Sequence, residues 1–128
     1  MKNNVEGDYI ETGVWRGGAS IYARAVLATL GKTDHRVSYV CDSFQGLPPG
    51  DRSLDRQDKG WELAYLGVLK EIVADNFNKY GLLDSNVVFA KGFFNKTMPP
   101  LLKKIGTLAV MRLDVSTIYD NYLIQLVH

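Results

Sequence analysis

Residues that build disulfides and zinc sites are scarce in this sequence, which has one cysteine and two histidines among 128 residues. Cys41 has no second cysteine to pair with, so an internal disulfide is excluded, and a lone cysteine agrees with a reducing compartment. The same scarcity leaves too few Cys and His ligands for a zinc site. His35 falls in a polar turn and His128 is the last residue, so neither is assigned a chemical role.

Long apolar runs and an excess of one charge are also missing. The sequence has 15 Lys and Arg against 14 Asp and Glu, interspersed along the chain, for a net charge of +1. This balance offers no electrostatic footprint for nucleic acid or for a membrane surface. No apolar run approaches the about 20 residues that a bilayer-spanning helix needs, and residues 1–8 contain no signal-peptide core. We therefore expect a cytoplasmic protein with no nucleic-acid or membrane partner.

The composition that remains is that of an ordinary globular domain, with 46% hydrophobic and 23% charged residues. A chain of this length builds one hydrophobic core. It contains no internal repeat, low-complexity tract or linker. We therefore treat residues 1–128 as one domain.

A glycine-rich turn is the most informative stretch of the chain. It reads Asp8-Tyr-Ile-Glu-Thr-Gly-Val-Trp-Arg-Gly-Gly, which predicts a buried strand, a turn, and a helix that begins near Ala19. Such a unit is the front of a nucleotide-binding βαβ fold, where the ligand lies over the strand end and against the first amides of the helix. The spacing is Gly-x-x-x-Gly-Gly, with Trp-Arg inside the turn, and it departs from the dinucleotide fingerprint of nicotinamide-dependent oxidoreductases. A nucleoside without a pyrophosphate, such as S-adenosylmethionine, suits this turn better; a tight connection without a ligand is the alternative.

Apolar periodicity predicts strands that alternate with helices. The expected strands are 5–12, 37–42, 86–90 and 107–114, and the expected helices are 19–30, 61–80, a short segment ending at 104, and 116–127. Segments 43–60 and 92–100 are expected to be loops, and Gly31 and Gly81 to stop the helices before them. The apolar rows expected to face the core are Ile21, Ala25 and Ala28 in the first helix, and Leu66, Leu69, Val73, Phe77 and Tyr80 in the second.

This alternation predicts an α/β domain with a parallel sheet and right-handed crossovers. Ligands of such sheets collect at the carboxyl ends of the strands. Glu11, Asp42 and Asp114 each stand at one of those ends. Three acidic residues at equivalent places favour a common site over chance.

Each of these acids has a functional and a structural interpretation. Asp42 either accepts hydrogen bonds from the two ribose hydroxyls of a nucleoside or caps the turn that follows it. Glu11 either orients the amino-acid end of the ligand, directly or through water, or ends its strand. Asp114 either holds a divalent cation, since hard cations prefer carboxylate oxygens, or stands alone as an incomplete site.

Five phrases of the chain, in the same order, resemble the macrocin O-methyltransferase family. They are Gly7-Asp-Tyr-Ile-Glu-Thr-Gly-Val-Trp-Arg-Gly-Gly, Asp42-Ser-Phe-Gln-Gly-Leu-Pro-Pro, Asn76-Phe-Asn-Lys-Tyr-Gly-Leu-Leu-Asp, Lys91-Gly-Phe-Phe-Asn-Lys-Thr-Met-Pro and Met111-Arg-Leu-Asp. Members of this family use S-adenosylmethionine and magnesium to methylate sugar hydroxyls. The similarity extends through about residue 114 and is far more specific than the glycine turn alone.

The resemblance implies a Rossmann-like class I methyltransferase sheet with strand order 3-2-1-4, incomplete on the side of the fifth strand. It implies a small-molecule hydroxyl as the methyl acceptor. It places Glu11, Thr12, Gly13 and Gly17 around the cofactor, Asp42 and Ser43 near its ribose, and Gly92 and Phe93 beside its adenine. It also makes Asp114 the first metal ligand of an Asp-Gly-Asp-x-Tyr segment.

The resemblance breaks after Asp114. Val115 and Ser116 replace the expected Gly-Asp, and the chain ends before the later strand that carries a paired Asp-Asp. Cofactor binding is therefore better supported than magnesium-assisted catalysis, and no residue is assigned as general base. Two hypotheses stay open, an O-methyltransferase and a non-catalytic, methyltransferase-like domain that binds the cofactor or a partner. In the implied strand order, the apolar strand 108–113 lies at the edge of the sheet, and we expect self-association through it.

Overall fold

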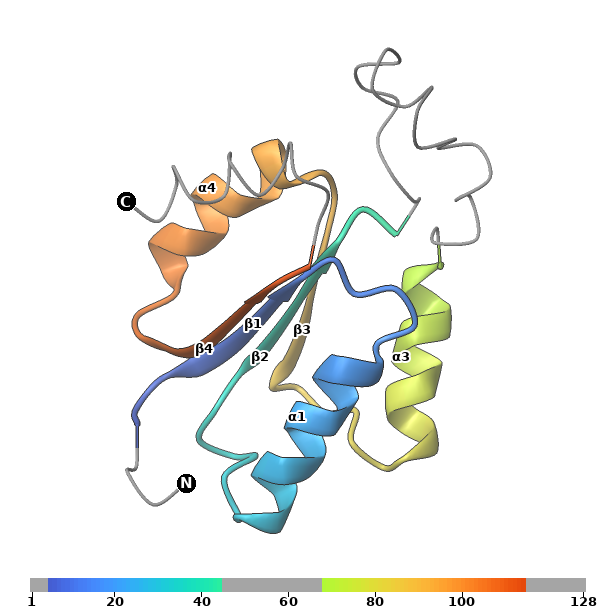
Figure 1. Ribbon diagram of the computed structural model, residues 1–128, viewed down its shortest axis with the longest axis vertical. Coiled ribbons are helices and arrows are strands. Elements are labelled where there is room, and N and C mark those ends of the chain that lie inside the picture. The colour runs from blue at the N-terminus through green and yellow to red at the C-terminus, as the bar shows by residue number, and fades with distance from the viewer. Residues whose placement is uncertain (1–4, 45–67, 115–128) are drawn as a thin grey trace.

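The computed structural model describes residues 5–44 and 68–114, which form a sheet covered by helices on both faces (Figure 1). The elements follow one another as β1 (Asp8–Thr12), α1 (Gly18–Thr29), β2 (Ser38–Asp42), α3 (Lys70–Lys79), β3 (Val87–Lys91), α4 (Phe94–Lys104) and β4 (Leu108–Leu113). The four strands are parallel and lie in the order β3-β2-β1-β4. The expected fold class and strand order are therefore confirmed. No helix in the described part of the chain is long and apolar enough to cross a membrane.

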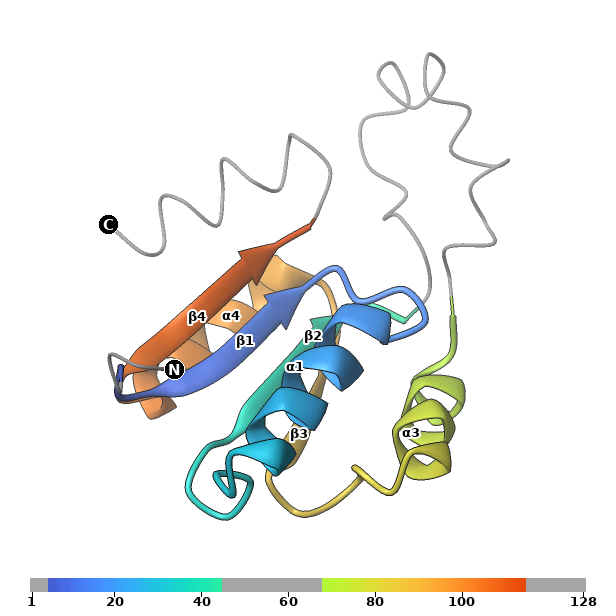
Figure 2. The ribbon, with the colours of Figure 1, turned by 60° about the horizontal axis from the view of Figure 1, so that its bottom comes forward.

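The side chains of each strand alternate between two apolar layers. Ile10 and Cys41 point toward α4 and pack with Phe94, Met98 and Ile105. Val40 and Val87 point the other way and pack with Val14, Phe44, Val73 and Phe77. Figure 2 shows α4 behind the sheet, with α1 and α3 in front of it. Both faces of the central strands are covered, which explains their continuous apolar sequence.

The second and third helices begin at residues other than those expected. Leu69 was expected inside a helix over 61–80, but it is the extended N-cap of α3 and is 55% exposed. Val73 and Phe77 of the predicted row are buried, Tyr80 is exposed, and residues 61–67 lie outside the described part of the chain. Helix α4 begins at Phe94, inside the expected loop 92–100, because Pro99 and Pro100 fall within the helix instead of preceding it.

The buried face of α1 also differs from the expected apolar row. Ser20, Arg24 and Leu27 are buried, whereas Ala28 is exposed and Ile21 and Ala25 are half-buried. Polar residues occupy this face because each finds partners on the strands that it covers. Gly31 has a φ of 66° just after the helix and Gly81 a φ of 67° after α3, so both expected helix stops are confirmed.

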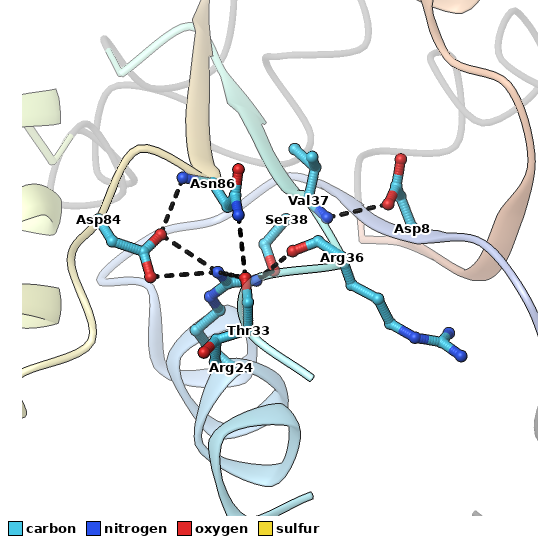
Figure 3. A network of polar contacts seen from close by, with 8 residues as sticks. All are labelled: Asp8, Arg24, Thr33, Arg36, Val37, Ser38, Asp84 and Asn86. Carbon is cyan, nitrogen blue, oxygen red and sulfur yellow. Dashed lines mark hydrogen bonds and ion pairs between the residues drawn. The ribbon is translucent and has the colours of Figure 1, made fainter. Parts of the chain in front are cut away.

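Arg24 is the largest polar member of that face and has no exposed surface. Its Nη1 donates to the carbonyl oxygen of Arg36 at 2.6 Å, and its Nη2 donates to the carbonyl oxygen of Thr33 at 2.8 Å. The same Nη2 pairs with Asp84, whose side chain is 45% exposed, at 3.1 Å (Figure 3). The guanidinium therefore ties α1 to the two segments that lead into β2 and β3.

Candidate functional site

The glycine turn between β1 and α1 is built on left-handed backbone. Gly13 has a φ of 81° and Gly17 a φ of 90°, a region in which side chains with a Cβ are disfavoured. A Cβ at Gly17 would lie 2.8 Å from Cγ1 of Val73 in α3. Gly17 is also the N-cap of α1 and makes no side-chain cap bond, so the first amides of the helix stay open to the turn.

Three backbone hydrogen bonds continue the sheet beyond its last paired residues. The amide of Asp114 donates to the carbonyl oxygen of Thr12 at 2.9 Å, and the amide of Gly13 donates to that of Cys41 at 3.0 Å. The amide of Gly92 donates to the carbonyl oxygen of Asp42 at 3.0 Å. These bonds bring the expected site residues from all four strands to one edge of the sheet.

Asp42 holds this edge together through its carboxylate. Its Oδ2 accepts the amide of Val14 at 2.7 Å, and its Oδ1 accepts the amide of Phe44 at 2.9 Å. The carboxylate thus fixes the glycine turn against the segment after β2, where Phe44 has a φ of 59° and Ser43 is buried. Each oxygen has a second lone pair, so the structural interpretation of Asp42 and its ribose role are compatible.

Glu11 lies under the turn and is 1% exposed. Its Oε1 accepts the hydroxyl of Ser20 at 2.6 Å, and its Oε2 accepts Nη1 of Arg112 at 2.5 Å. Burial raises the pKa of Glu11, and the hydrogen bonds from Ser20 and Arg112 oppose that rise. Because both oxygens already have partners inside the protein, Glu11 is an anchor for its neighbours.

Two further buried groups lie beside the anchor. The Thr12 hydroxyl at the end of β1 has no hydrogen-bond partner within residues 5–44 and 68–114, although unpartnered buried hydroxyls are uncommon. Such a group fits a site that a polar ligand completes. Cys41 is fully buried in β2, and burial raises the pKa of its thiol to about 12, with the charges of Asp42 and Glu11 adding to the effect. A thiol of this kind is not a nucleophile.

The segment after β3 is shaped by Gly92, whose φ is 144°. A Cβ at this position would lie 2.7 Å from Cγ2 of Thr97. Phe93 is the extended N-cap of α4 and is half-buried. The short link between β3 and α4 therefore passes close to the end of β2, where Asp42 stands.

Asp114 is placed differently from a metal ligand. Its side chain is 63% exposed, and its Oδ2 pairs with Nη1 of Arg112 at 3.0 Å. Within the described residues, no group of three or more His, Cys, Asp or Glu side chains is arranged to hold a metal ion. Magnesium needs near-octahedral oxygen coordination, and one carboxylate paired with a guanidinium does not fit it. The metal role of Asp114 stays a prediction.

The sequence analysis missed Ser20 and Arg112, the two residues that hold Glu11. Arg112 faces Glu11 directly in the parallel pairing of β4 with β1. A cation placed between two acids at a strand end, two residues before Asp114, was the available signal. Trp15 and Arg16 of the turn were noted as bulky, and the Arg16 guanidinium lies 4.3 Å from the centre of the Trp15 ring.

Comparisons with known proteins agree with this geometry. The family model of macrocin-O-methyltransferases (TylF) matches residues 1–128. A tetracenomycin derivative 4'-O-methyltransferase of Streptomyces olivaceus is 46% identical over 118 residues, which are 89% of this chain and 44% of that protein. Demethyldecarbamoylnovobiocin O-methyltransferase of Streptomyces niveus is 44% identical over 119 residues, 88% of this chain and 43% of its own. Mycinamicin III 3''-O-methyltransferase of Micromonospora griseorubida is 40% identical over 121 residues, 89% of this chain and 46% of its own.

A solved structure gives the same result in three dimensions. The O-methyltransferase NovP superposes with a TM-score of 0.77 at 42% identity, over 88% of this chain and 47% of that chain. The chain thus spans less than half the length of the relatives that it matches. A family model that matches from the first residue to the last, and a shared fold at this identity, agree with one another. The chain belongs to the macrocin-O-methyltransferase family.

Proposed function

We propose that this chain carries the cofactor site of an S-adenosylmethionine-dependent O-methyltransferase that acts on a hydroxyl of a sugar or natural-product-like small molecule. The observation that carries the proposal is the joining of the glycine turn, Asp42 and the Gly92 segment at one sheet edge by hydrogen bonds. The acceptor class follows the relatives, whose names assign them O-methylation of tetracenomycin, novobiocin and mycinamicin intermediates.

The residues at the edge fit an adenosyl ligand. Asp42 has carboxylate lone pairs left for ribose hydroxyls, and Gly13 and Gly17 keep the turn free of side chains beside it. Gly92 and Phe93 lie next to Asp42, where the adenine is expected. When bound, S-adenosylmethionine supplies the methyl group and the leaving sulfide. The protein's contribution is to hold donor and acceptor in line, and alignment of this kind supplies several kcal/mol of the barrier.

The ribose role of Asp42 is tested with a cycle of two ligands and two proteins, read by calorimetric titration. The ligands are S-adenosylhomocysteine and its 2'-deoxy analogue, and the proteins are the parent and Asp42→Ala. A charge-assisted hydrogen bond contributes on the order of 1.5–3 kcal/mol. We expect the deoxy analogue to bind that much more weakly to the parent, and the difference to disappear in Asp42→Ala. Equal discrimination by both proteins would assign Asp42 a structural role alone, and a preference for NAD would overturn the cofactor proposal.

A second candidate is a non-catalytic domain that binds the cofactor or a partner. The observation in its favour is the ion pair of Asp114 with Arg112, together with Val115 and Ser116 where the family pattern has Gly-Asp. It predicts binding of S-adenosylhomocysteine without methyl transfer, and indifference to magnesium. Magnesium-dependent transfer of labelled methyl to a sugar or polyol hydroxyl, lost in Asp114→Ala, excludes this candidate. The cytoplasmic location stays a prediction.

A further inference from the structure

Arg112 is the exposed member of the charged group at the ends of β1 and β4. Its Nη1 alone makes both ion pairs, to Oε2 of Glu11 and to Oδ2 of Asp114. Nε and Nη2 have no hydrogen-bond partner in the part of the chain that the structure describes, and the side chain is 45% exposed. One edge of a planar guanidinium is therefore fixed by the protein while the other edge faces outward.

Burial decides which member of this group can meet a ligand. Glu11 is 1% exposed and uses both oxygens inside the protein, so it cannot be the group that a ligand touches first. Its effect is to hold Nη1 of Arg112 in place, since a buried carboxylate pairs strongly with a guanidinium. Asp114 is 63% exposed and holds the same nitrogen from the other side. The two carboxylates together restrict the rotamers of Arg112, whose long side chain is otherwise flexible.

The position of Arg112 relative to the turn indicates what it would bind. Arg112 pairs in the sheet with Glu11, two residues before Gly13, and Glu11 also accepts the hydroxyl of Ser20 in the first turn of α1. Arg112 therefore projects on the α1 face, beside the end of β1 over which an adenosyl ligand of this fold lies. Asp42 and Gly92 stand on the opposite side of β1, in β2 and after β3, where the ribose and adenine are expected. The remaining end of S-adenosylmethionine is its amino acid, a zwitterion.

We infer that Arg112 recognises the α-carboxylate of the cofactor's amino-acid end through its free Nε and Nη2 edge. The exposed Asp114 carboxylate beside it complements the α-ammonium group, so the pair matches the zwitterion charge for charge. Glu11 is a positioning residue that acts through Arg112. This inference rests on the proposed function, because it assigns the third part of the same ligand.

The test compares ligands that differ in the carboxylate alone. S-adenosylhomocysteine carries it, and the decarboxylated analogue 5'-(3-aminopropylthio)-5'-deoxyadenosine does not. We expect Arg112→Met to bind S-adenosylhomocysteine about ten- to a hundredfold more weakly than the parent and to bind the decarboxylated analogue unchanged. Arg112→Lys keeps the charge without the two-donor fork, and we expect it to recover part of the lost affinity. Lys103→Met removes one exposed positive charge from α4, and we expect no effect on either ligand.

A double variant separates recognition from folding. Arg112→Met alone leaves Glu11 as a buried carboxylate without its partner, and unfolding of that variant would obscure binding. Glu11→Gln with Arg112→Met removes both charges, and we expect its stability to recover while its affinity for S-adenosylhomocysteine stays low. Recovery of affinity together with stability would overturn the recognition role, as would equal weakening of both ligands by Arg112→Met. A parent chain that binds neither ligand would refute the proposed function itself.

Discussion

Replacement of Gly17 by alanine tests whether the turn depends on close contact between α1 and α3. The backbone at Gly17 has a φ of 90° and a ψ of 6°, a conformation that costs an L-residue about 1–2 kcal/mol. The new Cβ would meet Cγ1 of Val73 at 2.8 Å, and overpacking of this kind costs about 1–3 kcal/mol. We therefore expect Gly17→Ala to lower the free energy of unfolding by roughly 2–5 kcal/mol, a large share of the roughly 5–15 kcal/mol of a typical domain.

The next residue provides a matched control. Gly18 is the first residue of α1, and a Cβ there meets nothing within 4 Å. We expect Gly18→Ala to leave stability unchanged or to raise it by up to about 1 kcal/mol, because alanine favours the helix. Urea unfolding of both variants measures the difference. Equal effects at the two positions would refute the reasoning from backbone and contact.

The steric part of the effect is separable from the backbone part. Val73→Ala removes Cγ1, the atom that the new Cβ would meet, so the double variant Gly17→Ala with Val73→Ala relieves the clash. We expect the two changes together to destabilise less than the sum of each alone, with a coupling of about 0.5–3 kcal/mol. Strict additivity would leave only the backbone contribution.

Three further predictions concern the anchor, the thiol and the sheet edge. Burial raises the pKa of Glu11 above 4.5, so its contribution to stability is present below the unfolded pKa and is lost as pH rises through the folded value; melting temperatures over a pH series should fall for the parent relative to Glu11→Gln, and the opposite trend would contradict this. Cys41, with a pKa of about 12, should resist a thiol reagent in mildly alkaline buffer until urea is added, and labelling at the rate of a free thiol would count against its burial. Within the described sheet β4 pairs with β1 alone and Val110 is 45% exposed, so sedimentation should show concentration-dependent association that Val110→Lys weakens; a parent chain that stays monomeric would end that expectation.

The order of the elements was predictable because it depends on local signals. Glycine at a helix stop, apolar runs in buried strands and an acid at each strand end are all visible in the sequence, and together they predicted the sheet order and the edge where the site residues meet. The family resemblance supplied the numbering of the strands in the sheet.

The buried face of α1 was not predictable in the same way. Its inward residues include Ser20 and Arg24, which a hydrophobicity pattern assigns to the surface. Their burial depends on partners far along the chain, such as Asp84 for Arg24 and Glu11 for Ser20. The site was incomplete for the same reason, because the contact of Arg112 with Glu11 joins residues 101 positions apart.

Helix α1 is fastened at both of its ends. Ser20 in its first turn is bonded to Glu11 of β1, and Arg24 one turn later is bonded to the carbonyl oxygens of Thr33 and Arg36. A helix held at two points can neither slide along the sheet nor rotate about its axis without breaking buried hydrogen bonds. The amides at its start are therefore ordered before any ligand arrives, and a ligand that binds there does not lose affinity to the ordering of that helix.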